Sequence, residues 1–144
     1  MKKIGIAADH AGFAYKEEIV KWLLSKGYDF VDFGTFTPES VDYPDMAHLL
    51  GAAVDRGEVT WGIAICGSGN GINIALNKHQ KVRSALCWTS EIAGMARLHN
   101  DANVCALPAR YIDLDVALQA VDTFLHTSFE SGGRHQRRVD KIPC

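Results

Sequence analysis

Short apolar runs alternate with amphipathic stretches along the whole chain. The apolar runs predict five strands, at residues 2–9, 28–34, 61–66, 83–88 and 103–107. Between and after them, apolar residues recur every three or four positions and predict helices, at residues 13–26, 44–56, 70–78, 90–98 and 114–127. The run WGIAIC is apolar at almost every position, as expected for a strand that is covered on both faces.

This alternation predicts a single α/β domain over residues 1–144. Five strands joined by helices form a parallel, doubly wound sheet with right-handed crossovers, a Rossmann-like three-layer sandwich. In such sheets, ligands bind beyond the carboxyl ends of the strands, near the switch in strand order. The first candidates for a site are therefore residues that follow strands: Asp9 and His10, residues 66–68 and residues 108–110.

A glycine-rich loop, CGSGNG, follows the third strand and precedes a helix. A dinucleotide-binding fingerprint requires a further glycine at position 72, which is isoleucine. A P-loop requires Gly-Lys-Ser/Thr, which is absent, and a Cys-x5-Arg phosphatase requires arginine at position 72. The sequence excludes these three classes.

The chemistry of the loop itself suggests another class. Backbone N–H groups at a helix N-terminus form an anion site, and glycines allow an anion to approach closely. We expect the same N–H groups to lower the pKa of the Cys66 thiol. A thiolate base beside an oxyanion site suits enolisation, in which a proton leaves the carbon next to a carbonyl. The alternative is a buried cysteine that ends a strand, beside glycines needed for tight packing.

Polar residues elsewhere in the chain extend this picture. Asp9 and His10 follow the first strand and could bind a sugar hydroxyl or phosphate, or could simply form a turn. His99 ends a helix and precedes the fifth predicted strand, which is expected to place it on the side of the sheet opposite Cys66. There it could act in catalysis or cap its helix.

A basic cluster near the C-terminus, GRHQRRVDK, could bind phosphate. Arginine matches phosphate oxygens in bidentate geometry, and a helical tail would place Arg134 and Arg138 on one face, with Arg137 nearby. A solvated basic tail is the alternative. Three further histidines show no companion pattern and are assigned neither a role nor a metal: His48, His79 and His126.

The composition of the chain indicates its compartment and the partners that it is not expected to bind. Apolar residues make up 47% of the chain and charged residues 22%, which argues against disorder and membrane spanning. A net charge of −2 argues against a general nucleic-acid binder. Asp9 and His10 interrupt the only signal-like segment. The four cysteines form no Cys-x-x-Cys pair, so we expect a reduced, cytoplasmic protein in which Cys87 and Cys105 are buried.

Six stretches of the sequence resemble the type B ribose-5-phosphate isomerases, a family that also includes galactose-6-phosphate and allose-6-phosphate isomerases. They occur in order between about residues 3 and 139: ADHAG, FGT with ESVDYPD, ICGSGNGI, ALNK, HNDANV and GGRHQRRV. The resemblance implies an enzyme of carbohydrate metabolism, in the pentose phosphate pathway, that interconverts ribose 5-phosphate and ribulose 5-phosphate through an enediolate without metal or cofactor. It also implies a homodimer or a dimer of dimers with shared active sites, and His99 could then serve the neighbouring chain.

The resemblance assigns roles by motif match. Cys66 would move the proton between C2 and C1, Ser68 would help to move the proton between O1 and O2, and His99, with Asp9 nearby, would assist opening of the furanose ring. Backbone amides of the loop would hold the developing oxyanion: Gly67, Gly69, Asn70 and Gly71. Side chains assigned to the substrate are Tyr43 and Asn100 for the sugar, and His10, Arg110, Arg134 and Arg138 for the phosphate.

The chain departs from the family pattern in three places. One branch of the family lacks the cysteine and uses a glutamate six positions later, whereas this chain keeps Cys66 and has Ile72, which cannot act as a base. Pro108 stands where glycine is more usual, which affects the placement of Arg110. The chain ends at Cys144, so we expect a C-terminal helical extension of some relatives to be absent.

Two other functions stay open at this point. The same chemistry could act on a six-carbon sugar phosphate, allose 6-phosphate or galactose 6-phosphate. A non-catalytic phosphate-binding subunit on the same fold is the alternative from another class.

Overall fold

The computed structural model describes residues 3–144, and the strands in that part of the chain form one sheet. The strands are β1 (Ile4–Ala8), β2 (Phe30–Asp32), β3 (Trp61–Cys66), β4 (Ser84–Leu86) and β5 (Val104–Pro108). Every pairing between them is parallel, and their order is β2-β1-β3-β5-β4. The predicted fold class is confirmed. Residue 2, which the sequence placed in the first strand, lies outside the described residues.

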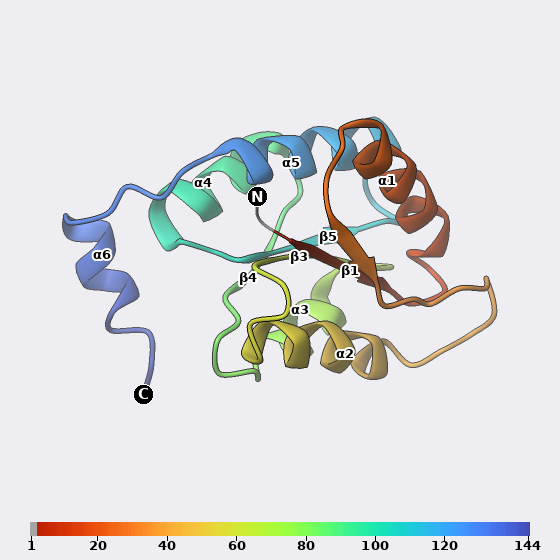
Figure 1. The fold of residues 1–144 in the computed structure, drawn as a ribbon, viewed down its shortest axis with the longest axis horizontal. Helices are drawn as coiled ribbons and strands as arrows, with labels where there is room; N and C mark the ends of the chain where they lie inside the picture. Colours follow the sequence, from red (N-terminus) through yellow and green to blue (C-terminus); the bar gives the residue numbers. More distant parts are fainter. Residues whose placement is uncertain (1–2) are drawn as a thin grey trace.

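Helices cover both faces of this sheet and complete the three layers (Figure 1). The helices are α1 (Phe13–Ser25), α2 (Tyr43–Asp55), α3 (Asn70–Leu76), α4 (Ser90–Asn100), α5 (Leu114–His126) and α6 (Arg134–Val139). The first, fourth and fifth pack on one face, and the second and third on the other. The basic tail is therefore helical, and its helix α6 lies beside α4.

The central strand β3 is buried on both faces. Ile63 and Ile65 pack in the core shared with α1, α4 and α5, whereas Ala64 and Cys66 pack in the core shared with α2 and α3. Side chains on a strand alternate between faces, so a strand with two covered faces needs apolar residues at every position. This explains the unbroken run WGIAIC.

The structure differs from the prediction mainly at the edges of the sheet. The edge strands β2 and β4 span three residues each, fewer than predicted, and each pairs on one side only. The helix α4 continues to Asn100 because Asp101, at a left-handed φ of 46°, is the residue that ends it. Pro44 lies in the first turn of α2, and Thr89 is the N-cap of α4, where its side chain accepts from the N–H of Ile92.

The strand order determines where a site can form. From β1 the chain moves to β2 on one side, and from β3 it moves towards β5 and β4 on the other, so the switch lies between β1 and β3. The carboxyl ends of β1, β3 and β5 therefore lie next to one another. The segments that follow these three strands are the ones the sequence indicated as candidates.

Candidate functional site

Three strand ends meet at Cys66. The N–H of Asp9 donates to the carbonyl of Ile65 at 3.2 Å, which joins the end of β1 to β3. The carbonyl of Cys66 accepts from the N–H of Ala109 at 3.0 Å, and the carbonyl of Gly67 from the N–H of Arg110 at 3.0 Å. Asp9, Cys66 and Arg110 are thus gathered at one edge of the sheet, and Pro108 does not prevent this placement.

The glycines of the loop are required by close contacts. Gly69 has a left-handed φ of 74°, and a Cβ there would overlap the Leu86 side chain. A Cβ on Gly71 would overlap the ring of Tyr43, which begins α2, so this ring covers the loop. Tight packing therefore contributes to the glycine pattern, and it also brings Tyr43 to the loop that holds Cys66.

The loop residues and Arg110 are close to one another. A Cβ on Gly67 would lie 3.3 Å from Cδ and Nη1 of Arg110, so the arginine side chain extends along the loop backbone. The N–H of Asn70 donates to the hydroxyl of Ser68 at 3.2 Å. The predicted loop residues and one predicted phosphate ligand are therefore neighbours.

The electrostatics of Cys66 differ from the expectation. The residue is only 4% exposed, and burial raises the pKa of its thiol, with a further contribution from the Asp9 carboxylate. Backbone N–H groups of Ile72, Gly69 and Ser68 act on the thiol in the opposite direction, as the sequence suggested, but do not prevail. The predicted lowering of the Cys66 pKa is wrong for this subunit, because desolvation of a thiolate outweighs the backbone donors.

Asp9 and His10 have structural partners as well as a place beside the loop. The Asp9 Oδ1 accepts from the N–H groups of Ala11 at 2.9 Å and Gly12 at 3.1 Å, and the residue is 7% exposed. Nδ1 of His10 lies 3.2 Å from the backbone nitrogen of Val41. The turn expected as the alternative for Asp9 is therefore present, and its carboxylate still influences Cys66.

The remaining predicted residues lie elsewhere in the chain. His99 and Asn100 end α4, whereas Arg134 and Arg138 are exposed on α6 beside it. In Figure 1, α6 lies at the left of the molecule, and β1 with α1 lies to the right. Within one chain, the structure does not bring this second group together with Cys66.

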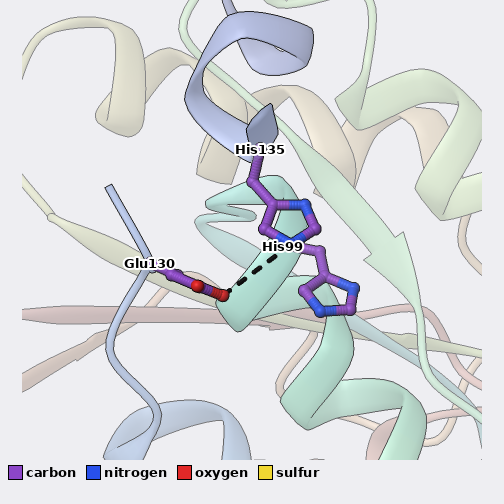
Figure 2. Close-up of side chains that lie close together, drawn as sticks. All are labelled: His99, Glu130 and His135. Atoms are coloured by element: carbon purple, nitrogen blue, oxygen red, sulfur yellow. Dashed lines mark ion pairs between the residues drawn. The ribbon is translucent and has the colours of Figure 1, made fainter. Parts of the chain in front are cut away.

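Two residues that the sequence did not indicate, His135 and Glu130, lie close to His99 (Figure 2). The rings of His99 and His135 stack with centroids 4.1 Å apart and an angle of 11° between their planes. Nε2 of His135 lies 3.7 Å from Oε2 of Glu130. The only hint in the sequence was the position of His135 between the arginines of the motif GGRHQRRV.

The same three residues are the natural candidates for a metal site. His99, Glu130 and His135 each offer one ligand atom, and these atoms lie within 4.8 Å of one another. The two rings are nearly parallel, however, so their nitrogens do not converge on one point as ligands of a single ion must. The arrangement fits a stacked pair better than a metal centre, and the absence of a metal from the reaction stays a prediction.

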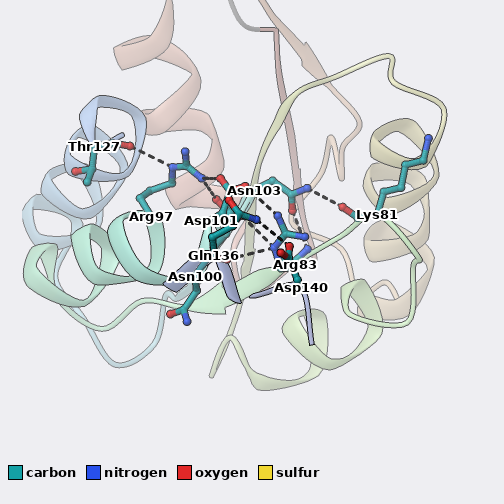
Figure 3. Close-up of polar contacts among 10 residues, drawn as sticks. Lys81, Arg83, Arg97, Asn100, Asp101, Asn103, Thr127, Gln136 and Asp140 are labelled. Atoms are coloured by element: carbon teal, nitrogen blue, oxygen red, sulfur yellow. Dashed lines mark hydrogen bonds and ion pairs between the residues drawn. The ribbon is translucent and has the colours of Figure 1, made fainter. Parts of the chain in front are cut away.

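A buried arginine holds the end of α4 in place (Figure 3). Arg97, which is 5% exposed, donates to Oδ1 of Asp101 at 2.9 Å and to the carbonyl of Thr127 at 3.2 Å. Nη2 of Arg83 donates to the other Asp101 oxygen at 3.1 Å. This network fixes the turn that directly follows His99 and was not evident from the sequence.

The burial of two other cysteines agrees with the sequence, whereas the contacts of two other histidines were not expected from it. Cys87 and Cys105 are fully buried, as expected. His48 and His79, which show no companion pattern in the sequence, are neighbours in the structure, where Nδ1 of His48 lies 2.8 Å from Nε2 of His79. Nδ1 of His79 lies 3.1 Å from Oδ2 of Asp55. This cluster is made by α2 and the segment after α3, away from the loop at Cys66.

Fold and site together define a doubly wound α/β protein with a buried thiol and a glycine-rich loop at the switch point of its sheet. Residues 4–142 match the protein family described as Ribose/Galactose Isomerase. Ribose-5-phosphate isomerase B of Escherichia coli K12 is 45% identical over 142 residues, which cover 99% of this chain and 95% of that protein. The chain belongs to the ribose/galactose isomerase family, as the sequence motifs indicated.

Solved structures agree with this assignment. Ribose-5-phosphate isomerase B of Clostridium thermocellum superposes with a TM-score of 0.95 at 51% identity, covering 97% of this chain and 94% of that one. Ribose-5-phosphate isomerase B of Mycoplasma genitalium, solved with bound ribulose-5-phosphate, has a TM-score of 0.93 at 41% identity, covering 97% and 93%.

Proposed function

We propose that the protein interconverts ribose 5-phosphate and ribulose 5-phosphate, without metal or cofactor, and that Cys66 is the base. The observation that carries the proposal is the position of Cys66 at the end of β3, facing backbone N–H groups of Ile72, Gly69 and Ser68. Relatives named ribose-5-phosphate isomerase B match nearly the whole chain, and one of them binds ribulose-5-phosphate, which supports the choice of substrate.

The proposed chemistry follows from a base beside hydrogen-bond donors. The Cys66 thiolate removes the proton from C2 of the open-chain aldose, and the electron pair forms an enediolate whose negative charge develops on O1. Backbone N–H groups at Gly67, Gly69, Asn70 and Gly71 stabilise that charge, and the Ser68 hydroxyl passes a proton between O2 and O1. The thiol then returns its proton to C1. One such oxyanion donor is worth roughly 10²–10³-fold in rate.

The raised pKa of Cys66 is compatible with this role. A sugar C–H next to a carbonyl is a weak acid, and a base with a higher pKa removes such a proton more readily once it is deprotonated. The backbone donors around the sulfur oppose the effect of burial and so support the thiolate.

The two groups of site residues suggest a shared active site. Cys66, Tyr43 and Arg110 belong to one edge of the sheet, while His99, Asn100, Arg134 and Arg138 belong to α4 and α6. We infer a homodimer, or a dimer of dimers, in which His99 of one subunit assists ring opening at the partner's Cys66. The phosphate would then lie between His10 and Arg110 of one subunit and the tail arginines of the other.

The compartment is proposed from the cysteines. Four cysteines are free, and three of them are buried. None of the helices formed by residues 3–144 is long and apolar enough to cross a membrane. A reducing cytoplasm is the compartment that fits these thiols.

The proposal is tested with purified protein on ribose 5-phosphate and allose 6-phosphate, with and without EDTA. We expect turnover of ribose 5-phosphate that EDTA does not change. Preference for allose 6-phosphate would keep the chemistry and replace the substrate, and loss of activity with EDTA would contradict metal independence. No turnover of either sugar phosphate would favour the alternative of a non-catalytic phosphate-binding subunit.

The role of Cys66 is tested by replacing it. Cys66→Ala should lower kcat on ribose 5-phosphate by about 10²–10⁴-fold, the usual contribution of a positioned base. Cys144→Ala is the matched control because this cysteine is exposed and lies outside the site. Activity of Cys66→Ala within about tenfold of the parent would rule out the thiolate base.

A further inference from the structure

His135 is buried against His99 and makes an unusual contact with it. The residue is 8% exposed, although it lies on a short helix whose arginines face solvent. Its ring covers one face of the His99 ring, at a centroid distance of 4.1 Å (Figure 2). Glu130, from the segment between α5 and α6, approaches Nε2 of His135 at 3.7 Å.

The charges around His135 come from three directions. His99 faces it from α4, Glu130 from the preceding segment, and Arg134 and Arg138 from its own helix. Burial lowers the pKa of His135, as do His99 and the two arginines, and Glu130 acts in the opposite direction. Together these influences favour the neutral form of the His135 ring.

A neutral aromatic ring is a suitable support for a histidine that handles protons. An imidazolium stacked on a neutral ring is attracted to its π-face, whereas two imidazolium rings 4.1 Å apart would repel each other. The stack also removes the rotational freedom that a histidine at a helix end would otherwise have. One face of the His99 ring is thus fixed by the stack, and no side chain or backbone group of residues 3–144 hydrogen-bonds to its nitrogens.

We infer that His135, held by Glu130, is a positioning residue that keeps the His99 ring oriented for opening of the sugar ring. The inference rests on the proposed isomerase function and adds to it a residue that touches neither the reacting carbons nor, in this arrangement, the loop at Cys66. Replacement of His135 should therefore slow the opening of the sugar ring and leave the proton transfers at C2 and C1 unchanged.

The substrate pair separates that step from the proton transfer. Ribose 5-phosphate is mainly a furanose and must open before C2 can be deprotonated. Ribulose 5-phosphate cannot close a furanose ring, because its C5 oxygen carries the phosphate. Exchange of the C1 hydrogen of ribulose 5-phosphate with D2O therefore requires Cys66 and the enediolate but not ring opening.

The experiment compares both readouts in His135→Ala, His135→Phe and the control His126→Ala, an exposed histidine at the end of α5. We expect His135→Ala to lower kcat on ribose 5-phosphate by about 10–100-fold, the loss that follows removal of a group that orients a metal-bound histidine. C1 exchange should stay within about threefold of the parent. His135→Phe keeps a flat ring and should restore kcat to within about threefold, and His126→Ala should match the parent.

Three outcomes would overturn the inference: unchanged kcat in His135→Ala, an equal fall in kcat and C1 exchange, or no restoration by His135→Phe. If His135→Ala does not fold, Glu130→Gln removes the charge that faces Nε2 of His135 and does so at an exposed side chain. This variant should lower kcat more than C1 exchange. An equal effect on both would again overturn it. A parent protein that turns over neither sugar would remove the proposed function, whereas an active parent with an unaffected His135→Ala would remove only this inference.

Discussion

Asp9 and Cys66 face each other at the carboxyl ends of the neighbouring strands β1 and β3. Their preceding residues, Ala8 and Ile65, are paired in the sheet. Burial raises the pKa of the Cys66 thiol, and the Asp9 carboxylate raises it further.

The rate should depend on pH through the Cys66 thiolate. Because the folded-state pKa of this thiol is raised above the ordinary value of 9.0, the thiolate fraction still increases at pH 9. We therefore expect kcat/KM for ribose 5-phosphate to rise from pH 7 to pH 9 without levelling. A plateau already at pH 7.5 would show that the base titrates lower and would contradict the assignment.

The same shift has a consequence for stability. The folded state holds the Cys66 proton more tightly than the unfolded chain, so this contribution is fully present below the unfolded pKa and is lost as pH rises through the folded one. The free energy of unfolding of the parent should thus decline more steeply between pH 8 and pH 10 than that of Cys66→Ala. Urea titrations at several pH values measure both slopes, and parallel slopes would be inconsistent with a raised pKa.

Alanine substitutions at Gly69 and Gly57 separate the cost of a left-handed backbone conformation from the cost of side-chain overlap. Both have a φ of 74°, but a Cβ on Gly57 would meet nothing within 4 Å, whereas one on Gly69 would overlap Leu86. Gly57→Ala should destabilise by about 1–2 kcal/mol, the cost of a left-handed conformation for an L-residue.

Gly69→Ala should cost more, by a further 1–3 kcal/mol, roughly the usual cost of overpacking. It should also lower kcat because it displaces the loop that carries Cys66. Denaturant unfolding and turnover measure the two effects. Equal destabilisation by both substitutions would mean that the loop can move without cost.

The contact between Arg97 and Asp101 should stabilise the turn after His99. Asp101→Ala removes the carboxylate that pairs with Arg97, a residue that is only 5% exposed. The substitution also removes the side-chain hydrogen bonds of the residue that ends α4. Because the Asp101 side chain is 38% exposed, we expect a loss of about 1–2 kcal/mol, below the full value for a buried charged hydrogen bond.

Glu58→Ala is the matched control for that substitution. It breaks a bidentate pair with Arg56 in which both side chains are more than half exposed, and no measurable change in stability is expected. Thermal unfolding of both variants decides the matter. A loss for Asp101→Ala no larger than for Glu58→Ala would show that the network does not hold the end of α4.

The parts of the fold that were predictable from the sequence are those whose pattern depends on burial along one element. The central strand β3 begins and ends where its apolar run does, because both of its faces are covered. The edge strands were overestimated, since apolar residues such as Phe33 continue past the last ladder pair and still pack against the core.

The arrangement of the candidate site was predictable where its residues belong to one loop and not where separate elements meet. The glycines and Cys66 stand together in the sequence, so their proximity required no tertiary information. The stack of His99 and His135 depends on how α6 lies against α4, which no local pattern encodes. The direction of the Cys66 pKa shift was missed because it is set by competition between burial and backbone donors, and burial is a property of the whole fold.

Sharing of the active site between subunits can be tested by mixing two inactive variants. Cys66→Ala lacks the proposed base but keeps His99, and His99→Ala lacks the proposed ring-opening residue but keeps Cys66. If each site takes Cys66 from one chain and His99 from the other, a mixed dimer contains one complete site. Equal amounts of the two variants, dissociated and reassembled at random, should recover about a quarter of the parent activity on ribose 5-phosphate, since half of the dimers are mixed and each has one of two sites.

The control for this experiment is Cys66→Ala mixed with Cys66→Ala,His99→Ala, which can form no complete site. A mixture that stays as inactive as this control, although mixed dimers are found by mass spectrometry, would show that each chain uses its own His99. That result would overturn the proposed sharing of the active site between subunits. Recovered activity would instead explain why the chain carries His99 on α4 and the arginines Arg134 and Arg138 on α6, away from Cys66.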